Sequence, residues 1–234
     1  MGKRSNLPRV ARDFYPTPLR GATPLFQFLR RDGIKTFAEI CAGPSPDKYQ
    51  LVQHLEAGGF HAAYAGDVAT GQDALKLTKA DLNGADAIVT NPPTKYEWEN
   101  PKGSTTHLLC HLLQHGLDLG VPAWWLIAHD FVTSLKAAPY LKYCPDIVVI
   151  ARMKWFPGSE FGAMDSFSWF KFDPAYRLGV TVIHHRDACL TSVNACHCCR
   201  RLFEARRSSH RYCSDVCRQR AHRSQEGAFR VTGA

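Results

Sequence analysis

Apolar runs of strand length alternate with segments of helical periodicity along most of the chain. This alternation is typical of a mainly parallel sheet with helical crossovers. The runs that predict strands are Thr36–Cys41, Phe60–Ala65, Asp86–Thr90, Ala123–Ala128 and Asp146–Ala151. The segments that predict helices are Thr23–Arg31, Lys48–Ala57 and Ser104–His115. Trp169–Phe172 and Val180–His184 are predicted to form a closing hairpin. The predicted fold class is therefore α/β, a Rossmann-like sheet with helices on both faces.

The apolar periodicity ends near Asp187–Asn194, where a basic, cysteine-rich segment begins. At 234 residues the chain has room for one full domain and a small appendage. We predict a basic N-terminal tail over residues 1–9, a folded domain over 10–187, a small cysteine module over 194–224 and a flexible tail over 225–234.

Positive charge is concentrated at the two ends of the chain. The formal total is +8, yet residues 1–20 carry a net +4 and residues 194–234 hold nine arginines against three acidic residues, a net +6. The segment between them is slightly acidic. Basic ends favour binding to a polyanion, because each neutralised phosphate releases counterions. A solubilising basic tail is the alternative interpretation.

No apolar run approaches the ~18–20 residues that span a bilayer. The first 20 residues also lack the apolar stretch of a secretory signal. We therefore expect a cytoplasmic, soluble protein without a membrane partner, and the sequence leaves its oligomeric state open.

The segment Asn91-Pro92-Pro93 carries the clearest chemistry of the predicted α/β domain. It follows a predicted buried strand, and ligands in open α/β sheets bind at the carboxyl ends of strands. Two successive prolines fix the backbone and remove two N–H donors, which holds the Pro92 carbonyl outward beside the Asn91 side-chain oxygen. Two such acceptors can bind both hydrogens of an amino group and stabilise the positive charge that develops as its nitrogen attacks an electrophile. A rigid strand-to-loop turn is the alternative.

Four short motifs occur in a fixed order along the domain. They are Asp13–Pro18 (DFYPTP), Glu39–Gly43 (EICAG), Asn91–Thr94 (NPPT) and Arg152–Ser159 (RMKWFPGS). In this order they resemble the amino-directed, S-adenosylmethionine-dependent methyltransferases, especially the small phage-type DNA N6-adenine methyltransferases. The resemblance covers about residues 12–175.

The resemblance implies a class I methyltransferase sheet that transfers a methyl group from S-adenosylmethionine to the exocyclic amine of a nucleic-acid base, with adenine N6 in DNA as the target. Four alternatives stay open, one of them a redox or zinc-sensing protein. The same loop can methylate RNA or a protein glutamine amide, or the chain can be a catalytically inactive, zinc-containing protein that binds nucleic acid.

The resemblance also implies roles for individual residues. The residues expected to contact the cofactor are Phe14, Tyr15, Thr17, Pro18, Glu39, Cys41, Gly43, Asp67 and Asp73. Among them, Glu39 faces its amino group, Asp67 its ribose hydroxyls and Asp73 its adenine amine, and Gly43 leaves room for it. The expected catalytic residues are Asn91, Pro92, Pro93 and Thr94, and the expected base or strand contacts are Tyr96, Trp98, Lys154 and Trp155.

Five of the nine cysteines lie within residues 196–217. Cys196-x2-Cys199 and Cys213-x3-Cys217 are separated by 13 residues, a spacing typical of a structural Zn²⁺ site. The alternative ligands that the sequence leaves open are Cys198, His197, His210 and His222.

The segment around these cysteines resembles short treble-clef or ribbon-like zinc modules, with Phe203 and Tyr212 as a small core. A predicted helix over Val216–Arg223 exposes arginines that can bind the phosphate backbone of DNA, or of RNA. These are Arg218, Arg220 and Arg223. A structural staple or a protein contact is the alternative role of the module.

Overall fold

The computed structural model describes residues 14–93, 106–155, 162–163, 165–186, 192–196, 198–199, 201–205 and 211–221. The chain divides into two compact units, Met1–Ala188 and Cys189–Ala234.

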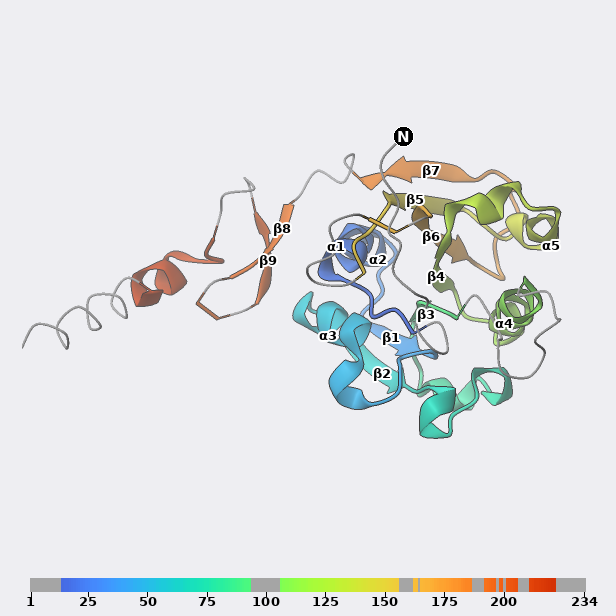
Figure 1. Ribbon diagram of the computed structural model, residues 1–234, viewed down its shortest axis with the longest axis horizontal. Helices are drawn as coiled ribbons and strands as arrows, with labels where there is room; N and C mark the ends of the chain where they lie inside the picture. Colours follow the sequence, from blue (N-terminus) through green and yellow to red (C-terminus); the bar gives the residue numbers. More distant parts are fainter. Residues whose placement is uncertain are drawn as a thin grey trace, which may run out of the picture. The chain divides into compact units, whose positions relative to one another are not determined.

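Seven strands form a single sheet in the first unit (Figure 1). They are β1 (Thr36–Glu39), β2 (His61–Ala65), β3 (Ala87–Thr90), β4 (Ala123–Ala128), β5 (Asp146–Ala151), β6 (Phe167–Phe172) and β7 (Val182–His185). Their order across the sheet is β2-β1-β3-β4-β6-β5-β7. The pairs β1–β2, β1–β3, β3–β4 and β5–β7 are parallel, whereas β6 is antiparallel to both of its neighbours. The predicted mainly parallel sheet is confirmed.

The predicted hairpin between the last two strands is wrong. β6 lies between β4 and β5, and β7 pairs with the opposite edge of β5. Burial explains the difference. Trp169, Phe170 and Phe172 of β6 are almost fully buried, so this strand takes an inner position. β7 is mostly exposed and forms an edge of the sheet. Apolar alternation identified both strands but carries no information about their partners.

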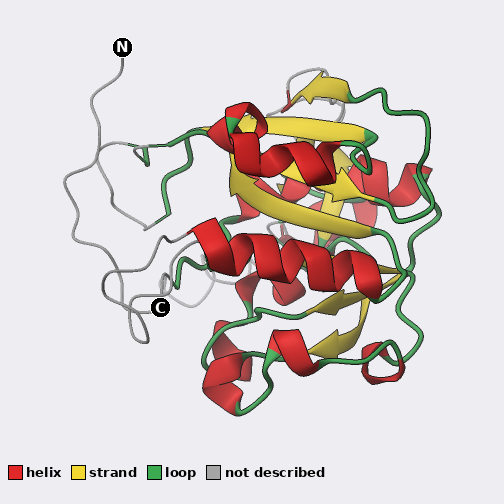
Figure 2. Ribbon diagram, turned by 90° about the vertical axis from the view of Figure 1, so that its right-hand side faces the viewer, coloured by secondary structure: helices red, strands yellow, loops and turns green. Residues whose placement is uncertain are grey.

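Helices cover both faces of the sheet, as Figures 1 and 2 show. The α-helices of the first unit are α1 (Leu19–Ala22), α2 (Phe26–Arg31), α3 (Gln50–Ala57), α4 (Thr106–Asp118) and α5 (Ala138–Leu141). Short 3-10 helices are η2 (Thr23–Leu25), η3 (Pro46–Lys48), η4 (Val68–Thr70), η5 (Ala74–Lys76), η6 (Ala80–Leu82), η7 (His129–Thr133) and η8 (Leu135–Ala137). In Figure 1, α1, α2 and α3 lie on one side of the sheet, and α4 and α5 lie on the other.

The helix boundaries differ from the predicted ones at turns that contain proline. Helical backbone begins at Leu19 rather than Thr23, because Pro18 is the extended N-cap and Pro24 fits the first turn of η2. The predicted helix from Lys48 is divided into η3, which has Pro46 at its start, and α3. The predicted start of the α4 helix at Ser104 lies outside the described residues, and the helix continues to Asp118.

The sheet is apolar on both faces, which is why helices must cover each of them. Strand β4 shows this most clearly, because successive side chains of a strand point to opposite faces. Trp125 and Ile127 join the core that contains Leu112 and Leu113 of α4. Trp124 points to the other face, where its ring lies 5.9 Å from the ring of Phe28 in α2.

A partly buried ion pair connects α2 to strand β5 and, through the same carboxylate, to β7. The Arg31 guanidinium donates two hydrogen bonds to the Asp146 carboxylate, at 3.0 and 2.7 Å, and the imidazole of His184 lies 2.8 Å from the same carboxylate. Burial of Asp146 opposes its ionisation, but the bonds to Arg31 and His184 outweigh that effect and lower its pKa. This carboxylate therefore joins α2, β5 and β7.

The second unit has its own two-stranded sheet. β8 (Ser192–Ala195) pairs antiparallel with β9 (Leu202–Ala205). A helix follows over residues 215–221, within the predicted helix Val216–Arg223, whose last two residues lie outside the described residues.

Replacing Asp146 tests the role of this ion pair. Asp146→Asn is expected to lower the free energy of unfolding at pH 7 by about 2 kcal/mol, because Arg31 loses charge-assisted hydrogen bonds but stays half-exposed to water. Because the folded pKa of Asp146 is lowered, the difference from the wild type should shrink as pH falls through that pKa. Urea unfolding at several pH values measures it. Asp118→Asn, at an exposed helix position, is the control, and equal effects of the two changes would contradict the assignment.

Candidate active site

The site lies where the order of strands reverses. β1 pairs with β2 on one side and with β3 on the other, so the chain winds in opposite directions from this point. Crevices at the carboxyl ends of such strands are where ligands bind in open α/β sheets. Glu39 ends β1, and Asn91 directly follows β3. The topology alone thus brings these two side chains to one edge.

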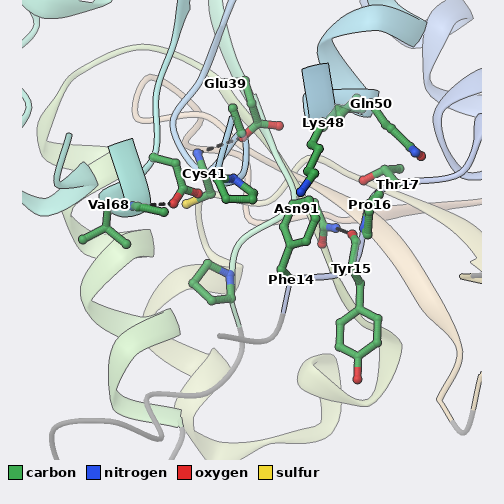
Figure 3. Close-up of a pocket in the computed structure, with 16 residues that line it drawn as sticks. Phe14, Tyr15, Pro16, Thr17, Glu39, Cys41, Lys48, Gln50, Val68 and Asn91 are labelled. Carbon is green, nitrogen blue, oxygen red and sulfur yellow. Dashed lines mark hydrogen bonds between the residues drawn. The ribbon is translucent and has the colours of Figure 1, made fainter. Parts of the chain in front are cut away.

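A cavity of about 220 Å³ lies at this edge (Figure 3). The residues that line it are Phe14, Tyr15, Pro16, Thr17, Glu39, Cys41, Ala42, Pro44, Lys48, Gln50, Leu51, Asp67, Val68, Ala69, Asn91 and Pro93. Its volume is somewhat below the ~300 Å³ at which ligand pockets usually begin. A ligand of nucleoside size would fill the cavity and extend beyond it.

Glu39 is a buried acid at the wall of the cavity, with 1% of its surface exposed. Its carboxyl accepts hydrogen bonds from the Cys41 backbone N–H, at 2.9 Å, and from the Thr90 hydroxyl. Burial raises the pKa of Glu39 to about 8, although both of these bonds act in the opposite direction. Such a group gains most from a cationic partner, which would compensate for its lost hydration.

Asp67 holds the turn that follows β1. One of its carboxylate oxygens accepts from the Gly43 backbone N–H at 3.0 Å, and the other accepts from the Ala69 backbone N–H at 2.8 Å. A carboxylate has about four acceptor positions, so acceptor capacity remains for a ligand in the cavity that Asp67 lines.

Gly43 adopts a left-handed backbone with φ of 115°, which favours glycine. A Cβ atom there would lie 2.5 Å from the ring of Phe14. The ring of Phe14 thus lies where a side chain at position 43 would be. The sequence had predicted room for the cofactor at this position. Phe14 and Gly43 together fix the wall of the cavity.

The Asn91 side chain has a defined orientation. Its amide nitrogen donates to the Tyr15 backbone carbonyl at 2.9 Å, as the dashed line in Figure 3 shows. A side-chain amide has one donor end and one acceptor end. Because the nitrogen is engaged, the oxygen Oδ1 is the end that can accept hydrogen bonds from a ligand. Asn91 and Pro93 both line the cavity.

Three aromatic side chains form a group that begins at Tyr15, whose backbone carbonyl binds Asn91. In Figure 3 the ring of Tyr15 points away from Glu39 and Cys41. Its centroid lies 5.7 Å from that of Trp155, which in turn lies 4.9 Å from the ring of Phe167, edge to face. All three are only partly buried, whereas the tryptophans of the core have at most 1% of their surface exposed. Tyr15 therefore belongs both to the lining of the cavity and to this aromatic group.

The structure brings most of the predicted site residues together. Those that line the cavity are Phe14, Tyr15, Thr17, Glu39, Cys41, Asp67, Asn91 and Pro93. Pro18, Gly43 and Pro92 are adjacent in sequence to lining residues, and Asp73 is not among the lining residues. The Asp73 carboxylate instead accepts from the Leu75 backbone N–H at 3.0 Å. Thr94, Tyr96 and Trp98 lie outside the described residues, as does Asp13.

Sequence reasoning missed Lys48, Gln50 and Thr90. Lys48 lines the cavity from the end of η3 and Gln50 from the start of α3, and Thr90 binds Glu39. A signal for the first two existed, because residues that begin the helix after a first-strand turn face the ligand side of such sheets. For Thr90, no pattern distinguishes a hydroxyl that faces the site from one that faces the core.

In the second unit, four cysteines form a compact group. The sulfur atoms of Cys196, Cys199, Cys213 and Cys217 all lie within 4.8 Å of one another. The distances Cys199–Cys213 and Cys213–Cys217 are both 3.6 Å. Four sulfurs bound at ~2.3 Å to a tetrahedral Zn²⁺ would be about 3.8 Å apart, so the donor set and its spacing fit this ion. Cys198 is not in this group, and the histidine alternatives lie outside the described residues.

Hydrogen bonding in this group favours the thiolate at Cys196 and the thiol at Cys213. Burial of Cys196 opposes ionisation, but backbone N–H groups of Cys199, Cys213 and Cys198 lower its pKa to about 6. The thiol of Cys213 donates to the sulfur of Cys217, and this bond and the one between Cys213 and Cys199 raise the pKa of Cys213 to about 12. Several crowded thiols cannot all ionise unless a cation neutralises them. The chemistry of the group therefore fits a metal-binding role.

Comparison with known proteins finds distant likenesses. No family model matches the chain, and no curated protein matches it. Among solved structures, it is similar to a Listeria monocytogenes protein provisionally named as a class I S-adenosylmethionine-dependent methyltransferase, with a TM-score of 0.48 and 11% identity over 72% of this chain and 65% of that one.

Two further solved structures are similar. A protein of Pyrococcus horikoshii provisionally named as an RNA methyltransferase has a TM-score of 0.47 and 14% identity over 73% of this chain and 91% of that one. The modification subunit of a provisionally named type I restriction enzyme from Vibrio vulnificus has a TM-score of 0.44 and 12% identity over 92% and 53%. The chain spans less than two thirds of the Listeria and Vibrio proteins. With TM-scores below 0.5, these likenesses carry no argument about function.

The predicted fold class is confirmed by the sheet itself. The first unit is a Rossmann-like α/β domain with helices on both faces, and the small C-terminal unit contains the four-cysteine group. None of the helices in the described part of the chain is both long and apolar enough to cross a membrane.

The buried acid makes stability depend on pH. Without ligand, the free energy of unfolding is expected to fall as pH rises from about 5 to 8, because folded Glu39 keeps its proton up to pH about 8 whereas the unfolded chain loses it near 4.5. The contribution is at most about 1.4 kcal/mol per pH unit. Glu39→Gln has a similar shape but does not titrate, so its curve should be flatter. Urea unfolding of both proteins across this range measures the difference. Parallel curves would exclude a raised pKa.

Proposed function

We propose that the protein transfers a methyl group from S-adenosylmethionine to the exocyclic amine of a nucleic-acid base, with adenine N6 in DNA as the target. The observation that carries the proposal is the orientation of Asn91. Its amide nitrogen is held by the Tyr15 carbonyl, which leaves Oδ1 as an acceptor beside a cavity that contains two acids. The rigid segment Asn91-Pro92-Pro93 follows a strand that pairs with the strand of Glu39.

The cavity residues fit the cofactor. S-adenosylmethionine would supply an electrophilic methyl group on a positively charged sulfur. Glu39 suits the ammonium of its amino-acid end, and the remaining acceptor positions of Asp67 suit ribose hydroxyls. Val68 is an apolar side chain that is 48% exposed and lines the same cavity, so it suits contact with the adenine ring. Thr17 also lines the cavity, and its buried hydroxyl has no hydrogen-bond partner within the described residues.

Asn91 and Pro92 would act on the amine that receives the methyl group. An exocyclic amine is a poor nucleophile because its lone pair is delocalised into the ring. Hydrogen bonds from its two hydrogens to Asn91 Oδ1 and the Pro92 carbonyl favour a pyramidal nitrogen and stabilise the positive charge that develops on it. Both acceptors are fixed before the reaction, so they also orient the amine.

The aromatic group that begins at Tyr15 gives the base a place next to the cavity. A base in a duplex must leave the stack before its amine can enter a site of this kind. Tyr15 and Trp155 are only partly buried, and a stack of a base on an aromatic ring contributes on the order of 1–3 kcal/mol. Lys154 is exposed next to Trp155 and suits a phosphate.

We further propose that the second unit binds Zn²⁺ through its four cysteines and contacts the phosphate backbone. Arg201, Arg211, Arg218 and Arg220 are exposed on it. Arg223 belongs to the same proposal but lies outside the described residues. The ion would supply only structure, because four cysteine ligands leave no open coordination position.

Substitution of Asn91 tests the enzyme proposal. Asn91→Ala is expected to lower the rate of labelled-methyl transfer into DNA by about 100-fold or more, the effect of removing one fixed polar group at a developing charge. Asn91→Asp keeps an acceptor and should retain more activity than the alanine variant. Thermal unfolding checks that both variants are folded.

The acceptor is identified by offering DNA, RNA and glutamine-containing protein in the same assay. Transfer into DNA at adenine supports the specific proposal, whereas transfer only into RNA or protein replaces its substrate. Equal rates for the wild type and Asn91→Ala would refute the catalytic role of Asn91.

Metal content tests the second unit. Cys213→Ser is expected to lose most of the zinc that copurifies with the wild type, because three thiolates hold the ion less well than four. Cys198→Ser is the matched control and should keep its zinc. Elemental analysis of the purified full chain measures both. The ligand assignment fails if Cys198→Ser loses as much metal as Cys213→Ser.

A further inference from the structure

The cavity has a basic side as well as an acidic one. None of the cofactor contacts predicted from the sequence involves the basic side. Lys48 lines the cavity from the end of η3, and Figure 3 shows its side chain running toward the middle of the cavity. It enters from the segment Pro44–Tyr49, which connects the turn after β1 to α3.

The backbone of this segment has few donors to offer a ligand. Pro44 and Pro46 have no N–H group. The Lys48 N–H donates to the Ser45 carbonyl at 2.9 Å, and the Tyr49 N–H donates to the Pro46 carbonyl at 3.3 Å. Most of the amides with which a turn can bind an anion are therefore missing or engaged, and the ammonium of Lys48 is the strongest donor that the segment presents.

The first turn of α3 adds to the positive side. The helix has eight residues, and its N-cap, Tyr49, makes no side-chain capping bond. Helices leave their first N–H groups without partners inside the helix and carry a partial positive charge at this end. Gln50 and Leu51, the first two residues of α3, both line the cavity. This end of the helix therefore favours a negatively charged group.

A buried hydroxyl points to a ligand at the same place. Thr17 is 2% exposed and lines the cavity, yet its hydroxyl has no hydrogen-bond partner within the described residues. Buried polar groups are almost always hydrogen-bonded in folded proteins. A ligand with an acceptor atom in the cavity would satisfy the Thr17 hydroxyl, which can donate its proton.

We infer that Lys48, the Thr17 hydroxyl and the first turn of α3 bind the carboxylate of an amino-acid group whose ammonium faces Glu39. The inference rests on the proposed function and refines it, because it makes the free amino-acid end of the nucleoside a requirement for binding. The charged side chain of Lys48 then binds the carboxylate that the backbone amides of the Pro44–Tyr49 segment cannot bind. It is a residue of cofactor specificity and has no part in methyl transfer itself.

The test compares two ligands that differ only in the carboxylate. Calorimetry of the full-length protein with S-adenosylmethionine and with decarboxylated S-adenosylmethionine gives a ratio of dissociation constants. The wild type is expected to prefer S-adenosylmethionine by about tenfold, the lower end of the effect of a charge-assisted hydrogen bond. Lys48→Met should bring this ratio to within about threefold, and Lys48→Arg should keep it.

Controls separate this role from general changes in the protein. Lys35→Met removes an exposed lysine directly before β1, at the opposite end of that strand from the site, and should leave the ratio as in the wild type. Thr17→Val has nearly the same shape without the hydroxyl, and it should weaken binding of S-adenosylmethionine more than that of the decarboxylated ligand. An unchanged ratio in Lys48→Met would overturn the inference.

The same measurements distinguish this inference from the proposed function. If the ratio depends on Lys48 but no acceptor is methylated, the carboxylate site stands and the methyl-transfer proposal fails. If methyl transfer depends on Asn91 while the ratio does not depend on Lys48, the inference fails and the proposed function stands. If neither ligand binds the wild type at millimolar concentration, both are refuted.

Discussion

The carboxyl group of Glu39 is the point on which the candidate site depends. It lies at the junction of β1 and β3 and accepts hydrogen bonds from the residue that ends β3 and from the turn that follows β1. Both segments are therefore held in one arrangement by a single buried group. Hydration of an acid in this position is lost, so the donors around it are as important to the fold as the acid is to the cavity. Asn91 directly follows the first of these segments and Gly43 lies in the second, where Tyr15 and Asp67 then fix their orientations.

The fold could be predicted well where the apolar pattern alone defines an element. β4 and β5 have the predicted bounds, because each is a continuous apolar run buried on both faces. The ends of helices were less predictable, since η2 and η3 place prolines in short helical turns that periodicity does not detect. The pairing of β6 and β7 was not predictable from the pattern, because a choice of partner depends on the whole sheet. The antiparallel insertion of β6 between β4 and β5 is such a choice.

The candidate site could be predicted where its residues belong to short motifs at strand ends. Glu39, Asp67 and Asn91 line one cavity because parallel strands end at the same edge. The contact between Gly43 and Phe14 could not be predicted, since Phe14 comes from a segment far away in the sequence. Lys48 shows the opposite case. Its residue type is common on surfaces, and only the cavity distinguishes it from a solvated lysine.

Residues 14–17 have a consequence for how the site is assembled. They form one wall of the cavity and are held there by contacts with Gly43 and Asn91, the second of them 76 positions away in the sequence. Closing a loop of this length costs chain entropy and precedes the gain from the contacts themselves. Because Asn91 directly follows β3, the wall of the pocket requires residues 14–17 and the end of that strand to be in place together. The shape of the pocket therefore depends on a long-range closure and cannot be set by the strand-end motifs alone.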